Sequence, residues 1–387
     1  MTLAFFEELY LSDSKDSPKG QQGVIIVGFL AFVKVCESII TISEEKMKIS
    51  LFGLFIGFLV MNASVQAEEI ILRYHSFLPL PHSANSKLVK PWGERLKKDS
   101  NGEITLEIYP AMQLGGRPPQ LVDQVREGVV DIIWTVAGYT PGRFPKLEVF
   151  DLPFMASTAV ATSQAAQEFA ETVGASDLEE YKVLAVHVHA PGTIHTKNTL
   201  IKSINDFKGL KIRGPTRVIT GMLSSLGATP VGMPVPEVAP SLSKGVIDGM
   251  VVPWEVMPSF KLHELTKAHT EISGDRGLYT TPFLFLMNKR RYESLSSEHR
   301  AIINKHSGMV LAKIAGQIWD EIEEPARKLA VEAGGEFFEL SGETLETMKS
   351  LGADVRKDWI QKSANKDLNG KMLVRTAQSL IEKYENE

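Results

Sequence analysis

Arg213 is the residue whose position most directly suggests chemistry. It ends a short predicted strand at residues 210–213 and stands immediately before Gly214-Pro215, so we expect it at the carboxyl end of a strand that meets a turn. In open α/β sheets, ligands bind at this edge. A guanidinium there offers a rigid, permanently charged fork that matches a carboxylate with two hydrogen bonds. The alternative is a surface salt bridge, and the residues alone favour neither interpretation.

Three histidines form a second candidate group. The spacing of His187 and His189 would put both imidazoles on one face of a strand, and His195 follows soon after, which suggests a metal site or a metal-dependent hydrolase. A further ligand at suitable spacing is missing, and histidines on a strand commonly pack in cores. The chain also contains no Gly-x-Ser-x-Gly, Walker, Gly-x-Gly-x-x-Gly or His-Glu-x-x-His motif. We therefore predict a protein that is not an enzyme and that uses no metal or other cofactor, with the hydrolase as an alternative.

The composition narrows the class of protein. With 43% hydrophobic and 23% charged residues, the chain is typical of a soluble globular protein. A formal net charge of -5 gives no reason to expect a nucleic-acid partner. The single cysteine, Cys36, lies upstream of a predicted signal peptide, so the secreted chain should have no thiol for a disulfide, a metal site or nucleophilic catalysis.

The signal peptide is predicted at residues 47–67. It has a basic start at Met47-Lys48, an apolar run at residues 51–61 and small residues at Val65 and Ala67. We expect cleavage before Glu68 and a periplasmic mature protein. Residues 1–46 are interpreted as a non-native upstream extension, with translation starting at Met47. The alternative, a membrane helix at residues 24–35, is interrupted by a lysine and is shorter than the roughly 20 residues that spanning requires.

Short strands and helices alternate along the mature chain. Strands are predicted at 70–75, 104–109, 130–135, 183–188, 210–213, 247–252 and 283–287, and helices at 85–99, 119–128, 158–173, 218–226, 237–244, 342–362 and 367–384. A longer helical stretch at 297–334 should be capped by Ser297 and kinked or divided at Pro325. This order is typical of an α/β protein with mostly parallel sheets covered by helices.

A family resemblance rests on motifs spread over most of residues 68–387. These motifs are Ser100-Asn101-Gly102-Glu103-Ile104, Tyr109-Pro110, Gln113-Leu114-Gly115, Gly128-Val129-Val130-Asp131-Ile132, Phe150-Asp151-Leu152-Pro153-Phe154, residues 206–213, Leu226-Gly227-Ala228-Thr229-Pro230 and Gly245-Val246-Ile247-Asp248-Gly249. In this order and spacing, the chain resembles the solute-binding subunits of tripartite ATP-independent periplasmic (TRAP) transporters, the dicarboxylate-binding-protein (DctP) family.

The resemblance implies a two-domain periplasmic clamp that closes on a small organic acid, with a long helix linking both domains. We expect domain I at 68–191 plus 280–318 and domain II at 192–279 plus 319–387. In the family, an arginine at the position of Arg213 ordinarily pairs with the carboxylate of the ligand. Hinges are expected near residues 191–193 and 279–282, where the chain should cross between the domains.

Departures from the family pattern indicate an apolar pocket. Relatives that bind strongly polar acids tend to carry Gln-Glu-Asn after the Asp-Gly pair, where this chain has Met250-Val251-Val252 and then Trp254. A second arginine of the family is replaced by Thr193 or His195, and an acidic residue after the Asp131 strand gives way to Trp134-Thr135-Val136. Such a pocket should reject compact dicarboxylates, because their second charge would lose water without gaining a partner.

The ligand-binding residues predicted from the sequence are Arg213, Trp254, Val252, Thr193, His195, Trp134, Tyr139, His75, Ser76 and Phe283. Trp254 is the preferred aromatic wall because it lies in a turn after a strand, whereas Trp134 has core packing as its alternative. His75 and Ser76, with His82, are included because the loop after the first strand should lie at the same sheet edge.

The predicted function is capture of an aromatic or other apolar monocarboxylate and its delivery to an ion-gradient-driven TRAP permease in the membrane. Two other functions of a ligand-binding protein remain as alternatives: a receptor subunit for a sensor kinase and a binding protein for an ATP-driven importer.

Overall fold

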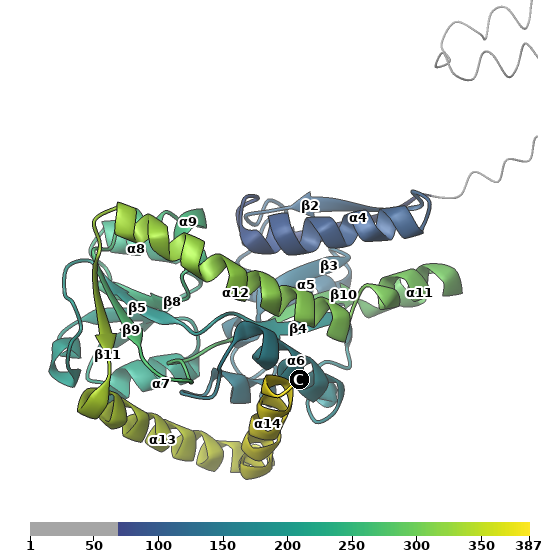
Figure 1. Ribbon diagram of the computed structural model, residues 1–387. Coiled ribbons are helices and arrows are strands. Elements are labelled where there is room, and N and C mark those ends of the chain that lie inside the picture. Colours follow the sequence, from purple (N-terminus) through teal and green to yellow (C-terminus); the bar gives the residue numbers. More distant parts are fainter. Residues whose placement is uncertain (1–68) are drawn as a thin grey trace, which may run out of the picture. The chain divides into compact units, whose positions relative to one another are not determined.

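The computed structural model describes residues 69–387 (Figure 1). The predicted upstream extension and signal peptide therefore lie outside the described residues. None of the helices within 69–387 combines the length and the apolar character needed to cross a membrane.

The first sheet has five strands in the order β2-β1-β3-β10-β4. Its strands are β1 (Ile70–Ser76), β2 (Ile104–Tyr109), β3 (Ile132–Val136), β4 (Tyr181–Val188) and β10 (Pro282–Asn288). The helical segments around it are η1 (Ala84–Val89), α4 (Lys90–Asp99), η2 (Pro118–Gln120), α5 (Leu121–Glu127), η3 (Ala137–Tyr139), η4 (Leu147–Asp151), α6 (Ala159–Glu171) and η5 (Ala175–Asp177). We call this sheet and its helices the first lobe.

The second sheet has six strands in the order β11-β9-β5-β8-β6-β7. Its strands are β5 (Thr193–Thr196), β6 (Lys211–Gly214), β7 (Thr229–Gly232), β8 (Gly249–Val252), β9 (Ala268–Ile272) and β11 (Glu336–Leu340). The helical segments around it are η6 (Ile204–Phe207), α7 (Arg217–Ser225), η7 (Val235–Glu237), α8 (Val238–Ser243), α9 (Val256–Ser259) and η8 (Leu262–Glu264). We call this sheet and its helices the second lobe.

Strand pairs in both sheets are parallel except where β5 or β10 takes part. Each of these strands directly follows a loop, 189–192 or 273–281, through which the chain crosses from one lobe to the other, so each enters its sheet from the crossing side. The two crossing segments lie side by side, because the Gly192 N–H donates to the Tyr279 carbonyl over 2.9 Å. Glycine is required there, since a Cβ on residue 192 would lie 2.0 Å from the Tyr279 ring.

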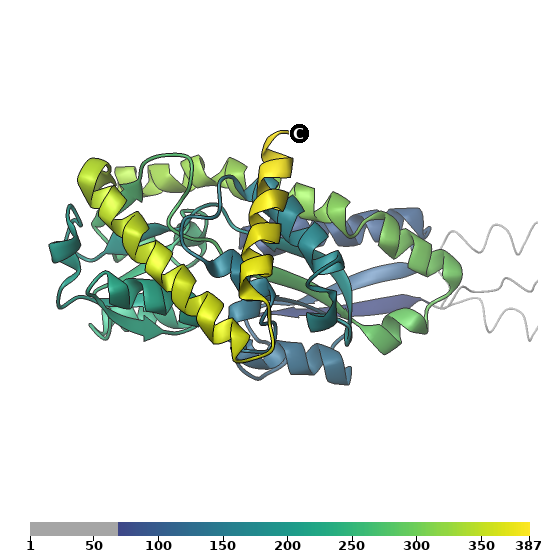
Figure 2. The same cartoon turned by 90° about the horizontal axis from the view of Figure 1, so that it is seen from below.

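The C-terminal helices connect the lobes. They are α10 (Lys289–Glu293), α11 (Ser297–Lys305), α12 (Met309–Glu332), α13 (Gly342–Ala364) and α14 (Gly370–Glu385). Helix α12 packs on α6 and β4 of the first lobe and on α9 and η8 of the second, as Figure 1 shows. From the other direction, Figure 2 shows α13 running from the second lobe back toward the first, where α14 packs against α6. Residues 370–385 thus lie against the first lobe, although the sequence-based division grouped them with domain II.

The helical stretch predicted at 297–334 is divided at Gly308, which has a φ of 67°, and not at Pro325, which lies inside α12. The side chain that caps α11 is that of Ser296, one residue before the predicted Ser297. The positive φ of Gly308 cannot be part of an α-helix, whereas a proline costs the helix a hydrogen bond whose loss can be tolerated.

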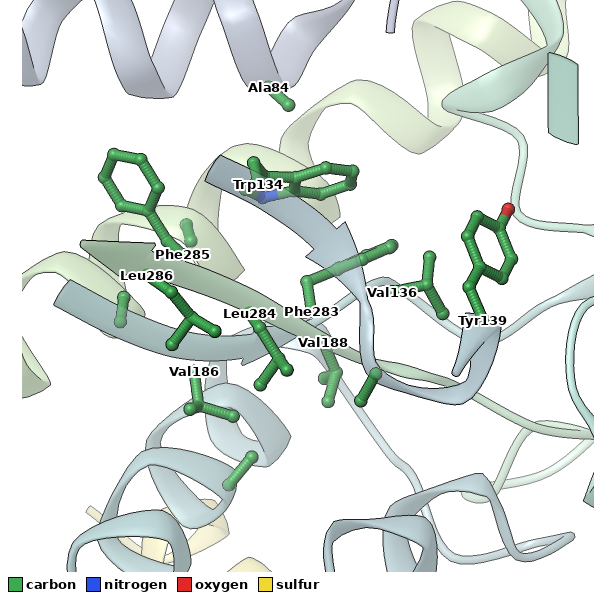
Figure 3. Close-up of a cluster of buried hydrophobic side chains, with 14 of the residues drawn as sticks. Ala84, Trp134, Val136, Tyr139, Val186, Val188, Phe283, Leu284, Phe285 and Leu286 are labelled. Carbon is green, nitrogen blue, oxygen red and sulfur yellow. The ribbon is translucent and has the colours of Figure 1, made fainter. Parts of the chain in front are cut away.

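The core of the first lobe explains why its central strands are almost wholly apolar. Strand β10 is buried along its whole length, and Figure 3 shows Leu284 and Leu286 on one face and Phe283 on the other. The Phe283 ring stacks on Trp134 of β3 with ring centroids 4.3 Å apart. This aromatic pair continues the core toward the second lobe.

Candidate functional site

A cavity of about 40 Å³ lies between the two lobes. The first lobe contributes Phe77, Leu78, His82, Trp134, Val136, Tyr139, His189, Thr281 and Phe283, the second contributes Arg213, Pro215, Val235, Val252, Pro253, Glu255 and Val256, and Tyr279 comes from a crossing segment. Most of these residues end, or directly follow, the strands β1, β3, β4, β6 and β8 at their carboxyl ends. That is the edge at which α/β sheets bind ligands.

Arg213 brings a buried positive charge to this cavity. Its side chain is on β6, and the residue is only 2% exposed. Within the described part of the chain, the guanidinium donates only to neutral groups, namely the Met233 carbonyl (2.9 Å), the Val251 carbonyl (3.3 Å) and the Tyr139 hydroxyl (3.4 Å). A buried charge is costly unless it is paired. The arrangement therefore favours binding of an anion beside Arg213.

The Tyr139 hydroxyl is oriented for the same purpose. Its oxygen accepts both the Arg213 hydrogen bond and the backbone N–H of Val235 (2.9 Å). Burial raises the pKa of Tyr139, so the phenol keeps its proton. Because the oxygen already accepts two hydrogen bonds, the O–H is left as a donor toward an anion.

Aromatic rings form the apolar walls. Phe77 lies 5.7 Å from Trp134 and 5.4 Å from Tyr139, measured between ring centroids, and Phe283 stacks on Trp134. Figure 3 shows Trp134, Val136, Tyr139 and Phe283 on neighbouring parts of β3, η3 and β10. These walls suit a flat, apolar ligand body.

A hydrogen bond holds Trp134 in place. Its indole N–H donates to Nε2 of His187 over 2.9 Å. Burial lowers the pKa of His187 to about 3, so the imidazole is neutral and Nε2 can accept.

Five of the residues predicted from the sequence line the cavity: Arg213, Val252, Trp134, Tyr139 and Phe283. The remaining five, His75, Ser76, Thr193, His195 and Trp254, lie outside its lining.

Trp254 packs within the second lobe. Its ring lies 4.6 Å from His195 and 5.8 Å from Phe337, and its indole N–H donates to Glu271 over 3.1 Å. Thr193 belongs to β5 and pairs with Val252 across the sheet. In a continuous strand, the side chains of residues 252 and 254 would point to the same face of the sheet. The turn at Pro253 ends the strand, so Val252 faces the cavity while Trp254 packs within the second lobe.

His75 and Ser76 lie inside β1 and are held by neighbouring helices. His75 Nδ1 is 2.7 Å from the Gln124 side chain, and the Ser76 hydroxyl donates to Asn85 over 3.3 Å. Phe77 and His82, which follow the end of β1, reach the cavity instead.

The three histidines considered as metal ligands have separate partners. His187 accepts from Trp134, His189 Nδ1 contacts the carbonyl of Ala190, and His195 contacts His269 and the Val252 carbonyl. Across residues 69–387, no three or more His, Cys, Asp or Glu side chains are grouped so that they could hold a metal ion.

The lining residues that were not predicted as ligand contacts include Phe77, Val235, Tyr279 and Glu255. The signal for Phe77 was its position directly after a predicted strand. Tyr279 was predicted only as part of a hinge. Val235 and Glu255 carried no local signal, because only the packing of the lobes brings them to the cavity.

Comparison with known proteins identifies the class. Residues 79–362 match the DctP family, bacterial extracellular solute-binding protein family 7. The chain belongs to this family, and it is the substrate-binding subunit of a TRAP transporter. The expected α/β clamp of two sheet domains linked by a long helix is thereby confirmed.

Solved structures share the whole fold. A TRAP solute-binding protein from a marine metagenome, in complex with 3-hydroxybenzoate, is 67% identical with a TM-score of 0.81, covering 82% of this chain and 99% of that one. A TRAP solute-binding protein from Rhodoferax ferrireducens T118, with copurified benzoate, is 42% identical with a TM-score of 0.80 and the same coverage. Among curated relatives, the C4-dicarboxylate-binding periplasmic protein DctP of Rhodobacter capsulatus is 27% identical over 74% of this chain and 85% of its own length.

Proposed function

We propose that this chain captures an aromatic monocarboxylate in the periplasm and delivers it to an ion-gradient-driven TRAP permease. The observation that carries the proposal is the buried guanidinium of Arg213, which has only neutral hydrogen-bond partners in the described chain and faces a cavity with aromatic walls. The aromatic acids bound by the marine metagenome and Rhodoferax ferrireducens proteins support it. Secretion would use the signal peptide predicted at residues 47–67.

The ligand carboxylate would accept hydrogen bonds from Arg213 and from the Tyr139 hydroxyl. The ring would then lie against Phe77, Trp134 and Phe283. A dicarboxylate such as succinate would have to bring a second charge against these walls, and removing that charge from water without a partner is unfavourable. We therefore expect the protein to prefer benzoate-like acids.

Ligand binding would accompany closure of the two domains about the segments at 191–193 and 279–282. Both domains contribute to the cavity, so a bound acid would be in contact with both at once. Closure would also create a surface that a permease can distinguish from the empty form. Small-angle scattering should show a smaller radius of gyration with ligand, whereas an unchanged profile at saturation would indicate a rigid pocket.

The direct test is a ligand screen on the secreted protein. A ligand present at 100 times its dissociation constant stabilises the folded state by about 2.7 kcal/mol, which a thermal-shift measurement detects readily. Benzoate and 3-hydroxybenzoate should raise the melting temperature, and succinate and malate should not displace them in calorimetric competition. Displacement by succinate as effective as displacement by benzoate would refute the aromatic-acid proposal.

A further inference from the structure

Glu255 and His82 form a second polar site in the wall of the same cavity. Glu255 follows β8 in the second lobe and is 3% exposed, while His82 follows β1 in the first lobe and is 1% exposed. Both residues line the cavity, and Nε2 of His82 is 3.5 Å from Oε2 of Glu255. Neither side chain is a hydrogen-bond partner of Arg213 or Tyr139 in the described chain.

The carboxyl group of Glu255 is unusual because one of its oxygens is buried without a hydrogen bond. Its Oε2 has no hydrogen-bond partner within residues 69–387. The indole N–H of Trp319 is close to this carboxyl group but also lacks a partner with good geometry. Buried polar atoms in folded proteins are almost always hydrogen-bonded, so an orphaned carboxyl oxygen in a cavity wall points to a ligand group.

Burial favours the uncharged form of both groups, which determines the chemistry they can offer. Burial, and next the nearby Glu323, raise the pKa of Glu255 well above its ordinary value, which favours the protonated form of its carboxyl group. Burial lowers the pKa of His82 to about 3. A protonated carboxyl group both donates and accepts, and it does not repel an anionic ligand.

The tautomer of His82 follows from its other contact. The backbone N–H of Ala84 donates to His82 Nδ1 over 3.1 Å, so the proton of the neutral ring resides on Nε2, which faces Glu255. The two residues together therefore present two donors and one acceptor. A hydroxyl group, which accepts and donates through one oxygen, matches this set.

We infer that Glu255 and His82 hydrogen-bond a hydroxyl group on the ring of the aromatic acid whose carboxylate Arg213 holds. The inference rests on the proposed function and adds to it the substrate class, hydroxylated aromatic acids, and the residues that select it. Benzoate leaves Glu255 without a partner, whereas a hydroxybenzoate satisfies it. Leaving a buried polar group unpaired is costly, so the correct hydroxy isomer should bind about tenfold more tightly than an isomer of similar size without a hydroxyl.

The test uses calorimetry on the secreted protein with benzoate, its three monohydroxy isomers and the three matching methylbenzoates. At one ring position at least, the hydroxy acid should bind about tenfold more tightly than the methyl acid. In Glu255→Leu this ratio should fall below about threefold, while Glu255→Gln, which keeps a neutral donor and acceptor, should retain most of it. Equal ratios in the native protein and in Glu255→Leu would overturn the inference, as would a native ratio near one at every position.

Thr281 also lines the cavity and is the competing candidate for the hydroxyl contact. Loss of the preference in Thr281→Val, with its retention in Glu255→Leu, would assign the contact to Thr281 and overturn the inference. Failure of the proposed function looks different, because then no acid in the series would bind.

Infrared spectroscopy gives a readout that does not require Glu255→Leu to fold. The C=O stretching band of a protonated carboxyl group is assigned to Glu255 if it is missing from the spectrum of Glu255→Gln. This band should shift when the hydroxy isomer binds, and it should shift less when the methyl isomer binds. Identical spectra with both isomers would contradict the hydrogen bond.

Discussion

Arg213 is the residue on which ligand affinity should depend most strongly. In Arg213→Met, the carboxylate of the acid would enter the cavity without its charged partner, although the apolar walls would remain. Removing one partner of a buried, hydrogen-bonded charge pair costs about 2 to 5 kcal/mol. The dissociation constant should thus rise by roughly 30-fold to several thousand-fold.

Arg213→Lys distinguishes the charge from the shape of the guanidinium. The three acceptors of Arg213 are Met233, Val251 and Tyr139, and they are contacted by Nε, Nη1 and Nη2 respectively. An ammonium group cannot reach three diverging acceptors and also bind a carboxylate. We expect a loss in affinity of at least about tenfold, which is smaller than in Arg213→Met because the charge remains.

The matched control is Arg327→Lys on α12, where the guanidinium is bound to a strand of the second lobe. Arg327 donates to Glu271 over 2.7 Å and does not line the cavity. Its replacement should leave the dissociation constant within about twofold of the native value, since partly exposed ion pairs contribute only about 0–1 kcal/mol.

The assay is isothermal titration calorimetry with benzoate and 3-hydroxybenzoate, accompanied by calorimetric unfolding without ligand. The unfolding scans establish that each variant is folded, because Arg213 also binds two carbonyl groups of its own lobe. If folded Arg213→Met bound either acid within threefold of the native affinity, Arg213 would not be the carboxylate anchor, and the proposed binding mode would be wrong.

Three further predictions follow from contacts around the cavity. In Tyr139→Phe, loss of the O–H donor to the carboxylate should weaken binding about tenfold by calorimetry, and an unchanged affinity would exclude the contact. Gly138→Ala would put a Cβ 2.4 Å from Thr216 Cγ2 of the other lobe. Overpacking of this size costs about 1–3 kcal/mol, so ligand affinity should fall roughly tenfold while the melting temperature without ligand is unchanged. An affinity equal to that of the native protein would argue against closure at this contact. Because burial lowers the pKa of His187 to about 3, the unfolded chain binds an extra proton between pH 6.5 and 3. The free energy of unfolding should therefore decrease as the pH is lowered through this window, by up to about 1.4 kcal/mol per pH unit. Urea titrations should find a smaller decrease in His187→Gln.

The order of strands and helices in the first lobe could be predicted from the sequence because it depends on local patterns. Strands β1, β2 and β4 begin and end within about two residues of their predicted limits, since each is an apolar or alternating run bounded by turn residues. Strands β5, β7, β9 and β11 were not predicted. Each has only four or five residues, such as the Ala-His-Thr-Glu-Ile of β9, too few for a clear periodic signal.

The position of Arg213 was predictable for the same local reason, whereas the role of Trp254 was not. A strand followed by Gly-Pro determines where Arg213 lies along the sheet edge. The direction of a side chain after a strand depends on the turn that follows, and Pro253 directs Trp254 into the packing of the second lobe. For Trp134, the sequence left open whether it packs in the core or contacts the ligand. The residue is buried in the core and also forms a wall of the cavity.

The sequence by itself determined the membership of the family, the α/β order, the absence of a thiol downstream of Cys36 and the segment that carries Arg213, the proposed carboxylate anchor. These properties depend on residue types and their spacing over short stretches. Only the tertiary structure decided that Glu255 and His82 are neighbours, since they belong to different lobes and lie far apart in the chain. It also decided that Trp134 and Phe283 form a stacked wall, because that contact depends on antiparallel pairing of β3 with β10. Contacts of this kind are set by how the sheets and lobes pack, and no local pattern in the chain encodes them.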